Sequence, residues 1–86
     1  MVKKLTKVEL RYYAQLREAL RTSREEVEIG LPATESEILA GLAGRHPVHA
    51  KLIQASRLAV NDEYFPHGTI IGEFTSADLI SPVSGG

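Results

Sequence analysis

Residues 25–47, EEVEIGLPATESEILAGLAGRHP, hold an alternating segment, a proline and a helix start in direct succession. Apolar residues at every second position from Glu25 to Leu31 predict a half-buried strand, which Pro32 ends. Thr34 and Glu37 have the spacing of a capping box, in which the threonine hydroxyl and the glutamate carboxylate each accept a backbone N–H. A strand followed closely by a capped helix is therefore the centre of the predicted fold.

The predicted helix has one apolar side, formed by Ile38, Leu39, Leu42 and Ala43. Gly44 and Pro47 end it, because proline cannot continue a helix and restricts the residue before it. Upstream, residues 7–14 alternate, and the side chains predicted to face the core are Val8, Leu10, Tyr12 and Ala14. Leu16, Ala19 and Leu20 then have the spacing of a short helix.

Shorter elements are predicted downstream. Residues 48–56 are ambiguous, and strands are expected at residues 57–61, 63–65, 69–71 and 75–81. Asn61-Asp62 is a plausible tight turn between the first two of these strands. In the last strand, Ala77 and Leu79 are expected to face the core and Ile80 to face outward.

This order of elements predicts an α+β fold, with a mixed sheet of about five strands and one main helix packed across one face. It resembles the β-grasp fold of ubiquitin. Residues 1–86 are predicted to form a single domain, consistent with the length of the chain. Residues 1–6 are expected to be an N-terminal extension, ordered or disordered, and residues 82–86 an extended, flexible C-terminal tail.

Composition narrows the function classes. The chain has no cysteine, which excludes a thiol nucleophile and fits a reducing cytoplasm. No long apolar run or signal-like segment is present, so neither membrane spanning nor export is expected. Residues 1–24 carry a net charge of +5 and residues 25–86 a net charge of −6. The basic stretch lacks regularly spaced aromatic residues, so nucleic acid is not expected as a partner. An acidic C-terminal part would steer a tail toward a basic pocket of a partner protein, but we favour a solvated surface as the interpretation of the charge.

The tail Ile80-Ser81-Pro82-Val83-Ser84-Gly85-Gly86 is the most informative motif. Terminal glycines add nothing to a core, but they offer a carboxylate without a neighbouring β-carbon, and this suits a narrow channel in another protein. Pro82 biases Ser81 toward an extended conformation, so the tail is expected to leave the sheet in a defined direction. A frayed end is the alternative, and we favour a working tail.

With this tail, the chain resembles the ubiquitin-like sulfur carriers, and among them the small subunits of molybdopterin synthase. The segment 12–18, YYAQLRE, is similar to an aromatic-aromatic-Ala-Gln-x-Arg-Glu motif in that family, and residues 45–47 and 59–61 also match. The last five residues match Pro-Val-Ser/Thr-Gly-Gly. Ser81 replaces a family proline and Ile80 an aromatic residue. Glu73-Phe74-Thr75 replaces an Asp-Gly-Asp turn, which makes the geometry of a predicted last hairpin uncertain.

The resemblance implies that Gly86 and Gly85 are the reactive end of a sulfur carrier. A ubiquitin-activating-type enzyme, using ATP and magnesium, would adenylate Gly86, and a persulfide donor would convert it to a thiocarboxylate. The large subunit of molybdopterin synthase would then receive the sulfur for cyclic pyranopterin monophosphate, in a heterotetramer. The chain itself would bind no cofactor and have no activity alone. Partner contacts are expected from Tyr13, Tyr64, Ile80, Pro82, Val83 and Ser84.

Other functions remain open at this stage. The same chemistry could supply sulfur for the thiamine thiazole or for tRNA thiolation. Gly86 could instead form isopeptide bonds, as in a ubiquitin-like modifier, or the chain could be a binding module with an inert tail. His46 and His49 have metal-ligand spacing, but Pro47 lies between them, so no metal site is expected.

Tyr12 and Phe65 are predicted to lie in the core.

Overall fold

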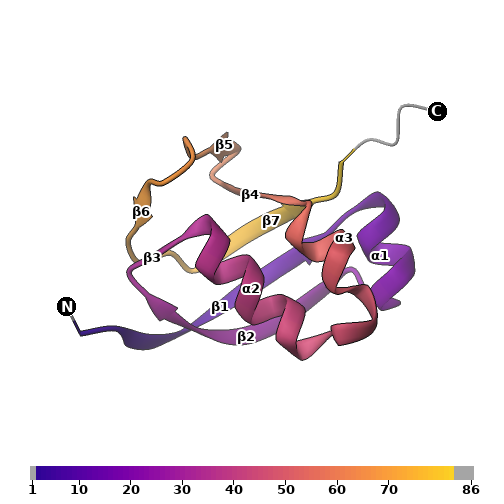
Figure 1. Cartoon of the computed structure of the whole chain (residues 1–86), viewed down its shortest axis with the longest axis horizontal. Coiled ribbons are helices and arrows are strands. Elements are labelled where there is room, and N and C mark those ends of the chain that lie inside the picture. Colours follow the sequence, from indigo (N-terminus) through magenta and orange to yellow (C-terminus); the bar gives the residue numbers. More distant parts are fainter. Residues whose placement is uncertain (1, 83–86) are drawn as a thin grey trace.

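A computed structural model describes residues 2–82 of the chain (Figure 1). A five-stranded sheet has the order β2-β1-β7-β4-β5, and a second sheet pairs β3 with β6. Helices α2 and α3 lie in front of the large sheet in Figure 1. The elements are β1 (Lys4–Tyr12), α1 (Ala14–Leu20), β2 (Arg24–Leu31), β3 (Ala33–Thr34), α2 (Glu35–Arg45), a 3₁₀ turn (Pro47–His49), α3 (Ala50–Gln54), β4 (Arg57–Val60), β5 (Glu63–Tyr64), β6 (Ile70–Ile71) and β7 (Ser76–Ile80).

Strands β1 and β2 form an antiparallel pair, in register from Lys4 opposite Leu31 to Arg11 opposite Arg24. Strand β1 is longer than the alternating pattern of residues 7–14 indicated, because residues 4–6 also pair with the end of β2. The expected extension at residues 1–6 is therefore wrong for residues 4–6. The inward position predicted for Ala14 is also wrong. Ala14 has a φ of 51° and starts α1, so its side chain is exposed.

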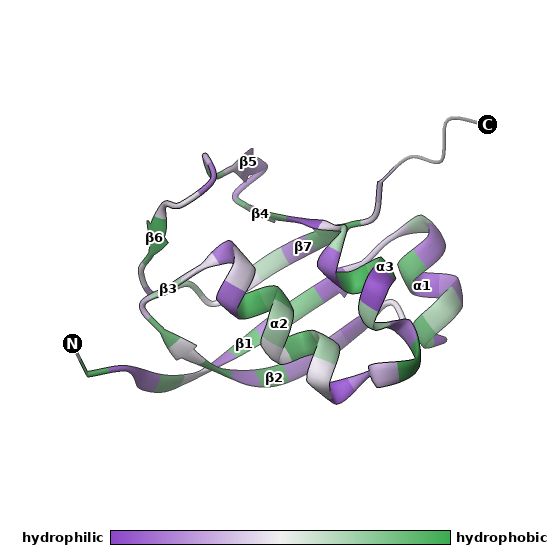
Figure 2. Cartoon of the chain, viewed as in Figure 1, coloured by the Kyte–Doolittle hydropathy of each residue, from purple (hydrophilic) through white to green (hydrophobic). Residues whose placement is uncertain are grey.

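Helix α2 begins with the predicted capping box. The Thr34 hydroxyl accepts from the Glu37 amide at 3.2 Å, and the Glu37 carboxylate accepts from the Thr34 amide at 2.9 Å. Its four predicted apolar residues are all buried, and Figure 2 shows hydrophobic positions in green along α2. The inward residues of β1, β2, β4 and β7 complete one core beneath the helix. Tyr12 belongs to this core as predicted, and Phe65 packs against it.

Strand β7 lies in the middle of the large sheet. It runs parallel to β1 and antiparallel to β4. Ala77 and Leu79 are buried and Ile80 is partly exposed, as the alternation predicted. Asn61 and Asp62 both have positive φ, at 53° and 64°, and form the predicted turn between β4 and β5.

The hairpin expected around Glu73–Thr75 is wrong. Strand β6 pairs with β3, so the chain reaches β7 through a connection instead of a hairpin. Phe74 anchors this connection in the core, and the Thr75 carbonyl accepts from the Glu9 amide at 2.9 Å. The ambiguous residues 48–56 contain the end of the 3₁₀ turn and α3, which buries Ile53 against the core. No helix within residues 2–82 is long and apolar enough to cross a membrane.

Candidate functional site: the docking face and the tail exit

The last strand delivers the tail from the centre of the sheet. Leu79 is fully buried, Ser81 is 5% exposed and Pro82 is exposed, so the chain leaves the core within three residues. Neighbours on both sides hold β7 in place, which fixes the point from which the following residues start. The predicted site residues Val83, Ser84, Gly85 and Gly86 lie outside the described residues.

Three predicted partner contacts lie on the sheet face opposite α2. Tyr13 and Ile80 follow Tyr12 and Leu79, which are paired in the parallel β1–β7 ladder. The Tyr13 side chain is 43% exposed and Ile80 is partly exposed. Tyr13, Ile80 and Tyr64 are called the docking face below. Exposed apolar residues of this kind are typical of protein interfaces.

Tyr64 reaches the docking face from the outer strand β5. It lies opposite Ala59 of β4, and Ala59 in turn lies opposite Asp78 of β7. Because directly opposite residues share a sheet face, Tyr64 and Asp78 are on the same side as Tyr13. Tyr64 is 51% exposed. The structure thus places Tyr13, Tyr64 and Ile80 on one face, although Tyr64 is separated from the other two by β4.

Arg57 links these strands and was missed in the sequence. Its guanidinium lies 5.1 Å from the centroid of the Tyr64 ring, within range of a cation–π contact. The Arg57 Nε donates to both Glu35 carboxylate oxygens, at 3.2 and 3.3 Å, and a terminal nitrogen donates to the Phe65 carbonyl at 2.8 Å. These contacts fix the guanidinium against the docking face and leave a cation beside an aromatic ring.

Asp78 is a second residue that the sequence did not single out. Its carboxylate accepts from the Tyr13 hydroxyl at 3.3 Å and forms an ion pair with Arg11 at 3.5 Å. Arg11 also donates to the Ser76 hydroxyl at 3.2 Å. The docking face therefore has polar contacts that orient Tyr13. Asp78 alternates with Ala77 and Leu79, and this alternation was the signal in the sequence that could have placed Asp78 on the outer side of β7.

A separate polar cluster joins β1, β2 and the end of α2. The Glu25 carboxylate accepts from the Tyr12 hydroxyl at 2.7 Å and lies 2.9 Å from the His46 Nε2, while Arg45 is 3.6 Å away. Burial by itself raises the pKa of Glu25, but the hydrogen bonds from Tyr12 and His46 and the adjacent positive charges lower it below its ordinary value. Burial and the bond to Glu25 raise the pKa of Tyr12. His46 is therefore engaged with a carboxylate. Residues 2–82 contain no cluster of three metal-ligating side chains.

Comparison with known proteins gives the family. The model of the ThiS family matches residues 10–86, nearly the whole chain. The chain belongs to the ThiS family. It is a ubiquitin-like sulfur-carrier protein by this membership, as the sequence resemblance predicted.

Solved structures share the fold of this ThiS family member. A Pyrococcus furiosus protein with the provisional name molybdopterin converting factor, subunit 1 is 20% identical, with a TM-score of 0.71 over 91% of this chain and 99% of that one. The crystal structure of SAMP1 from Haloferax volcanii is 24% identical, with a TM-score of 0.70 over 94% of this chain and 100% of the other. The Haloferax volcanii HVO 2177 protein is 19% identical, with a TM-score of 0.70 over 95% and 88%. The predicted β-grasp fold is confirmed.

Proposed function

We propose that this ThiS family member is the sulfur-donating small subunit of molybdopterin synthase, with Gly86 as the residue that carries the sulfur. The observation that supports this most is the position of β7. The central strand ends at Ile80 and the chain emerges at Pro82, and Tyr13 of the docking face contacts the same strand through Asp78. A partner that binds the docking face would thereby receive the Val83-Ser84-Gly85-Gly86 segment at a fixed starting point.

The proposed chemistry makes the Gly86 carboxylate reactive in two steps. The carboxylate attacks the α-phosphorus of ATP and releases pyrophosphate, which gives an acyl adenylate. Hydrosulfide then attacks the acyl carbon and AMP leaves, so the product is a thiocarboxylate. Where the donor is a persulfide, the acyl disulfide first formed is reduced by a thiol. Activation is needed because a carboxylate is a poor acyl donor, and splitting the transfer into two displacements lowers each barrier.

The activating chemistry is assigned to partners. An adenylating enzyme of the ubiquitin-activating type would bind ATP and magnesium, and a persulfide-bearing sulfurtransferase would supply sulfur, in the cytoplasm. The large synthase subunit would bind cyclic pyranopterin monophosphate and take the sulfur from Gly86. A heterotetramer with a carrier at each end is the expected assembly. The β-grasp domain would hold and present the tail.

The choice of sulfur acceptor rests on sequence motifs and not on the fold alone. The Tyr12–Glu18 segment and the Pro-Val-Ser lead-in favour molybdopterin over the thiamine thiazole or thiolated tRNA. The name of the Pyrococcus furiosus protein points in the same direction. A ubiquitin-like modifier is the second candidate, because the activation step would be shared and only the acceptor would differ.

A reconstitution experiment tests the acceptor. The thiocarboxylated chain is incubated with a large synthase subunit and cyclic pyranopterin monophosphate, and the mass of the chain is followed. We expect loss of the terminal sulfur only when both are present. Sulfur loss to a thiazole-forming enzyme instead, or conjugation of Gly86 to lysines, would replace the proposed acceptor while leaving the carrier role intact.

A further inference from the structure

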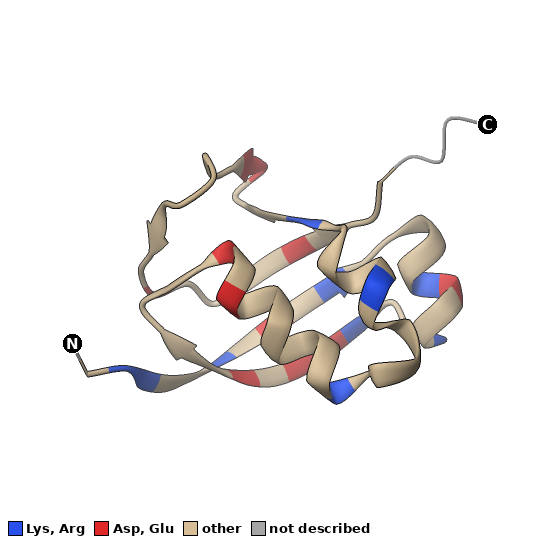
Figure 3. Ribbon diagram, in the orientation of Figure 1, with Lys and Arg blue, Asp and Glu red and all other residues tan. Residues whose placement is uncertain are grey.

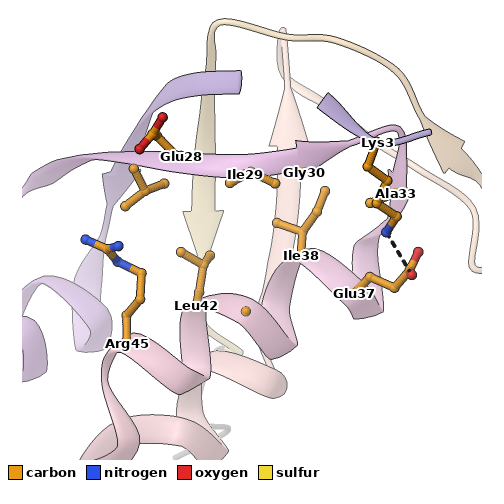
Figure 4. Close-up of a pocket in the computed structure, with 11 residues that line it drawn as sticks. Lys3, Glu28, Ile29, Gly30, Ala33, Glu37, Ile38, Leu42 and Arg45 are labelled. Atoms are coloured by element: carbon orange, nitrogen blue, oxygen red, sulfur yellow. Dashed lines mark hydrogen bonds and ion pairs between the residues drawn. The ribbon is translucent and has the colours of Figure 1, made fainter. Parts of the chain in front are cut away.

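A groove runs between the outer strand β2 and helix α2, on the opposite side of the domain from β5. Its volume is about 320 Å³. Figure 4 shows Ile38, Leu42 and Arg45 rising from the helix toward the strand, with the Lys3–Glu37 ion pair closing one end. The floor is apolar, and the rim carries charged side chains.

The strand that borders this groove has a free edge. β2 is the outermost strand of the large sheet and pairs only with β1 within residues 2–82. It is eight residues long. Alternate backbone N–H and C=O groups of such a strand point away from the sheet, and they are able to pair with a further strand. The groove thus combines an apolar floor with a row of backbone hydrogen-bonding groups.

Gly41 keeps the groove open at a cost to the helix. A β-carbon at this position would meet no atom within 4 Å in the described structure, and its φ is not positive. Glycine within a helix is about 1 kcal/mol less favourable than alanine. Neither backbone conformation nor lack of space explains this residue. Gly30, which lines the groove from β2, also has room for a β-carbon at ordinary contact distance. Gly30 alternates with buried Ile29 and Leu31, so its β-carbon would lie on the outer side of β2. Gly41 is therefore the glycine on the groove side that the fold does not require.

The other face of β2 carries two carboxylates, with Arg24 at one end of the strand and Lys7 of β1 opposite Glu28. Glu26 and Glu28 alternate with buried Val27 and Ile29, so they lie on the side of β2 away from the core, and both are exposed. Figure 3 shows acidic positions of β2 in red. Glu28 forms no ion pair among the described residues, and Figure 4 shows its side chain pointing away from α2. Glu26 has only a long contact of 3.9 Å with Lys7, and both side chains are 67% exposed. Exposed pairs of this kind contribute little, so both carboxylates remain open to a basic neighbour.

We propose that this groove binds an extended segment of a partner protein, added to β2 as a further strand, in which apolar residues alternate with lysine or arginine. Side chains alternate between the two faces of a strand. One set would enter the apolar groove beside Gly41, and the other would lie next to Glu26 and Glu28. Backbone pairing provides affinity in this mode, and the alternate side chains provide specificity.

Two other occupants fit less well. A second copy pairing through β2 would bring Glu25, Glu26 and Glu28 near their own counterparts, and like charges on adjacent strands are unfavourable. The C-terminal segment 80–86 of another copy carries no basic side chain to meet these carboxylates. The groove is also separate from the docking face, because the groove lies on the α2 side of the sheet and Tyr13, Tyr64 and Ile80 lie on the opposite side. A partner bound at β2 would leave Tyr13, Tyr64 and Ile80 accessible.

The test uses the full chain labelled with ¹⁵N and capped peptides of about eight residues, matched to the length of β2. The test peptide alternates valine with lysine, and the control peptide alternates valine with glutamate. We expect the Val–Lys peptide to shift the amide signals of β2 and of residues 38–45 and to slow hydrogen exchange along β2. The Val–Glu peptide should bind at least about tenfold more weakly, a difference of about 1.4 kcal/mol.

Matched glycine variants separate the groove from the rest of the surface. Gly41→Leu fills the groove and should weaken Val–Lys binding about tenfold or more. Gly44→Leu, in the same helix but outside the groove and equally unobstructed, should bind like the wild type. The double change Glu26→Lys with Glu28→Lys should reverse the preference toward the Val–Glu peptide. Equal binding by both glycine variants, shifts confined to other elements, no binding, or dimerisation through β2 would each overturn the proposal.

Discussion

The Glu35 carboxylate, at the start of α2, accepts a hydrogen bond of 2.7 Å from the backbone N–H of Leu58 in β4. Glu35 is 8% exposed, and the same carboxylate accepts from Arg57. β5 pairs with β4 only at Ala59 and Val60, so Glu35 takes the place of a strand partner for the beginning of β4. One side chain thereby joins the main helix to the strand that carries Arg57 toward the docking face.

Replacing Glu35 with alanine should lower the free energy of unfolding by about 1.5–3 kcal/mol, because a buried N–H and a guanidinium would lose their acceptor. Urea unfolding followed by circular dichroism measures this. Glu73→Ala is the control, since Glu73 is exposed and should change stability by less than about 0.5 kcal/mol. Equal stability of the two variants would show that the Glu35 contacts contribute nothing.

Ile80→Asp should weaken binding of the adenylating enzyme and of the large synthase subunit by at least about tenfold, because it places a charge within the apolar part of the docking face. Isothermal titration calorimetry measures the affinity. Ile70→Asp is the matched control, because Ile70 is 56% exposed in β6 of the small sheet, outside the docking face. Wild-type affinity in Ile80→Asp would remove this face from the interface.

The Tyr12–Glu25–His46 cluster predicts a stability term that depends on pH. The pKa of Glu25 is lowered from 4.5 in the folded chain, so its contribution is fully present above about pH 4.5. It is lost as the pH falls through the lower folded-state value. Glu25→Gln should therefore be less stable than the wild type at neutral pH, and urea unfolding should show the difference shrinking in acid.

Tyr12→Phe checks the cause of that pKa. Removing the hydroxyl takes away a 2.7 Å hydrogen bond to Glu25, so the pKa of Glu25 should rise in this variant. Titration of the Glu25 side chain by NMR measures the change. A Glu25 pKa that is unchanged by the substitution would assign the lowering to His46 and Arg45 alone.

Replacing a glycine by alanine should lower the free energy of unfolding where the glycine has a positive φ and raise it where the glycine lies within a helix. Gly68 has a φ of +85°, so Gly68→Ala should destabilise the fold by about 1 kcal/mol. Gly41→Ala should raise the free energy of unfolding by up to about 1 kcal/mol, because helix propensity improves and no atom is displaced. Urea unfolding of the two variants gives both signs. Destabilisation by Gly41→Ala would mean that this glycine serves the fold.

Local patterns predicted the parts of the fold that local interactions decide. The Thr34–Glu37 capping box, the Asn61-Asp62 turn and the burial of Leu79 beside partly exposed Ile80 each follow from residues a few positions apart. Part of the docking face could be predicted for the same reason, because residues alternate between the two sides of the first and last strands. The alternation indicated that Tyr13 and Ile80 face outward, whereas Tyr64 came from the resemblance to the family alone.

Contacts between distant segments could not be predicted in this way. The pairing of β3 with β6 and the bond from Leu58 to Glu35 join residues more than twenty positions apart. Strands were predicted at residues 69–71 and 75–81, and the resemblance to the family implied a hairpin between them. The two residues of β6 gave no indication that their partner is β3. The groove beside Gly41 was also invisible, because it depends on how α2 lies against β2.

Intact mass spectrometry of the chain tests the central claim most directly. The wild-type chain, a chain lacking Gly86 and a chain extended by one alanine are incubated with ATP, magnesium, an adenylating enzyme and a sulfur donor. We expect replacement of one oxygen by sulfur at Gly86 in the wild type alone, with equal stability of all three chains to urea. An unchanged wild-type mass under conditions that convert an established carrier, or sulfur on the chain lacking Gly86, would contradict the account.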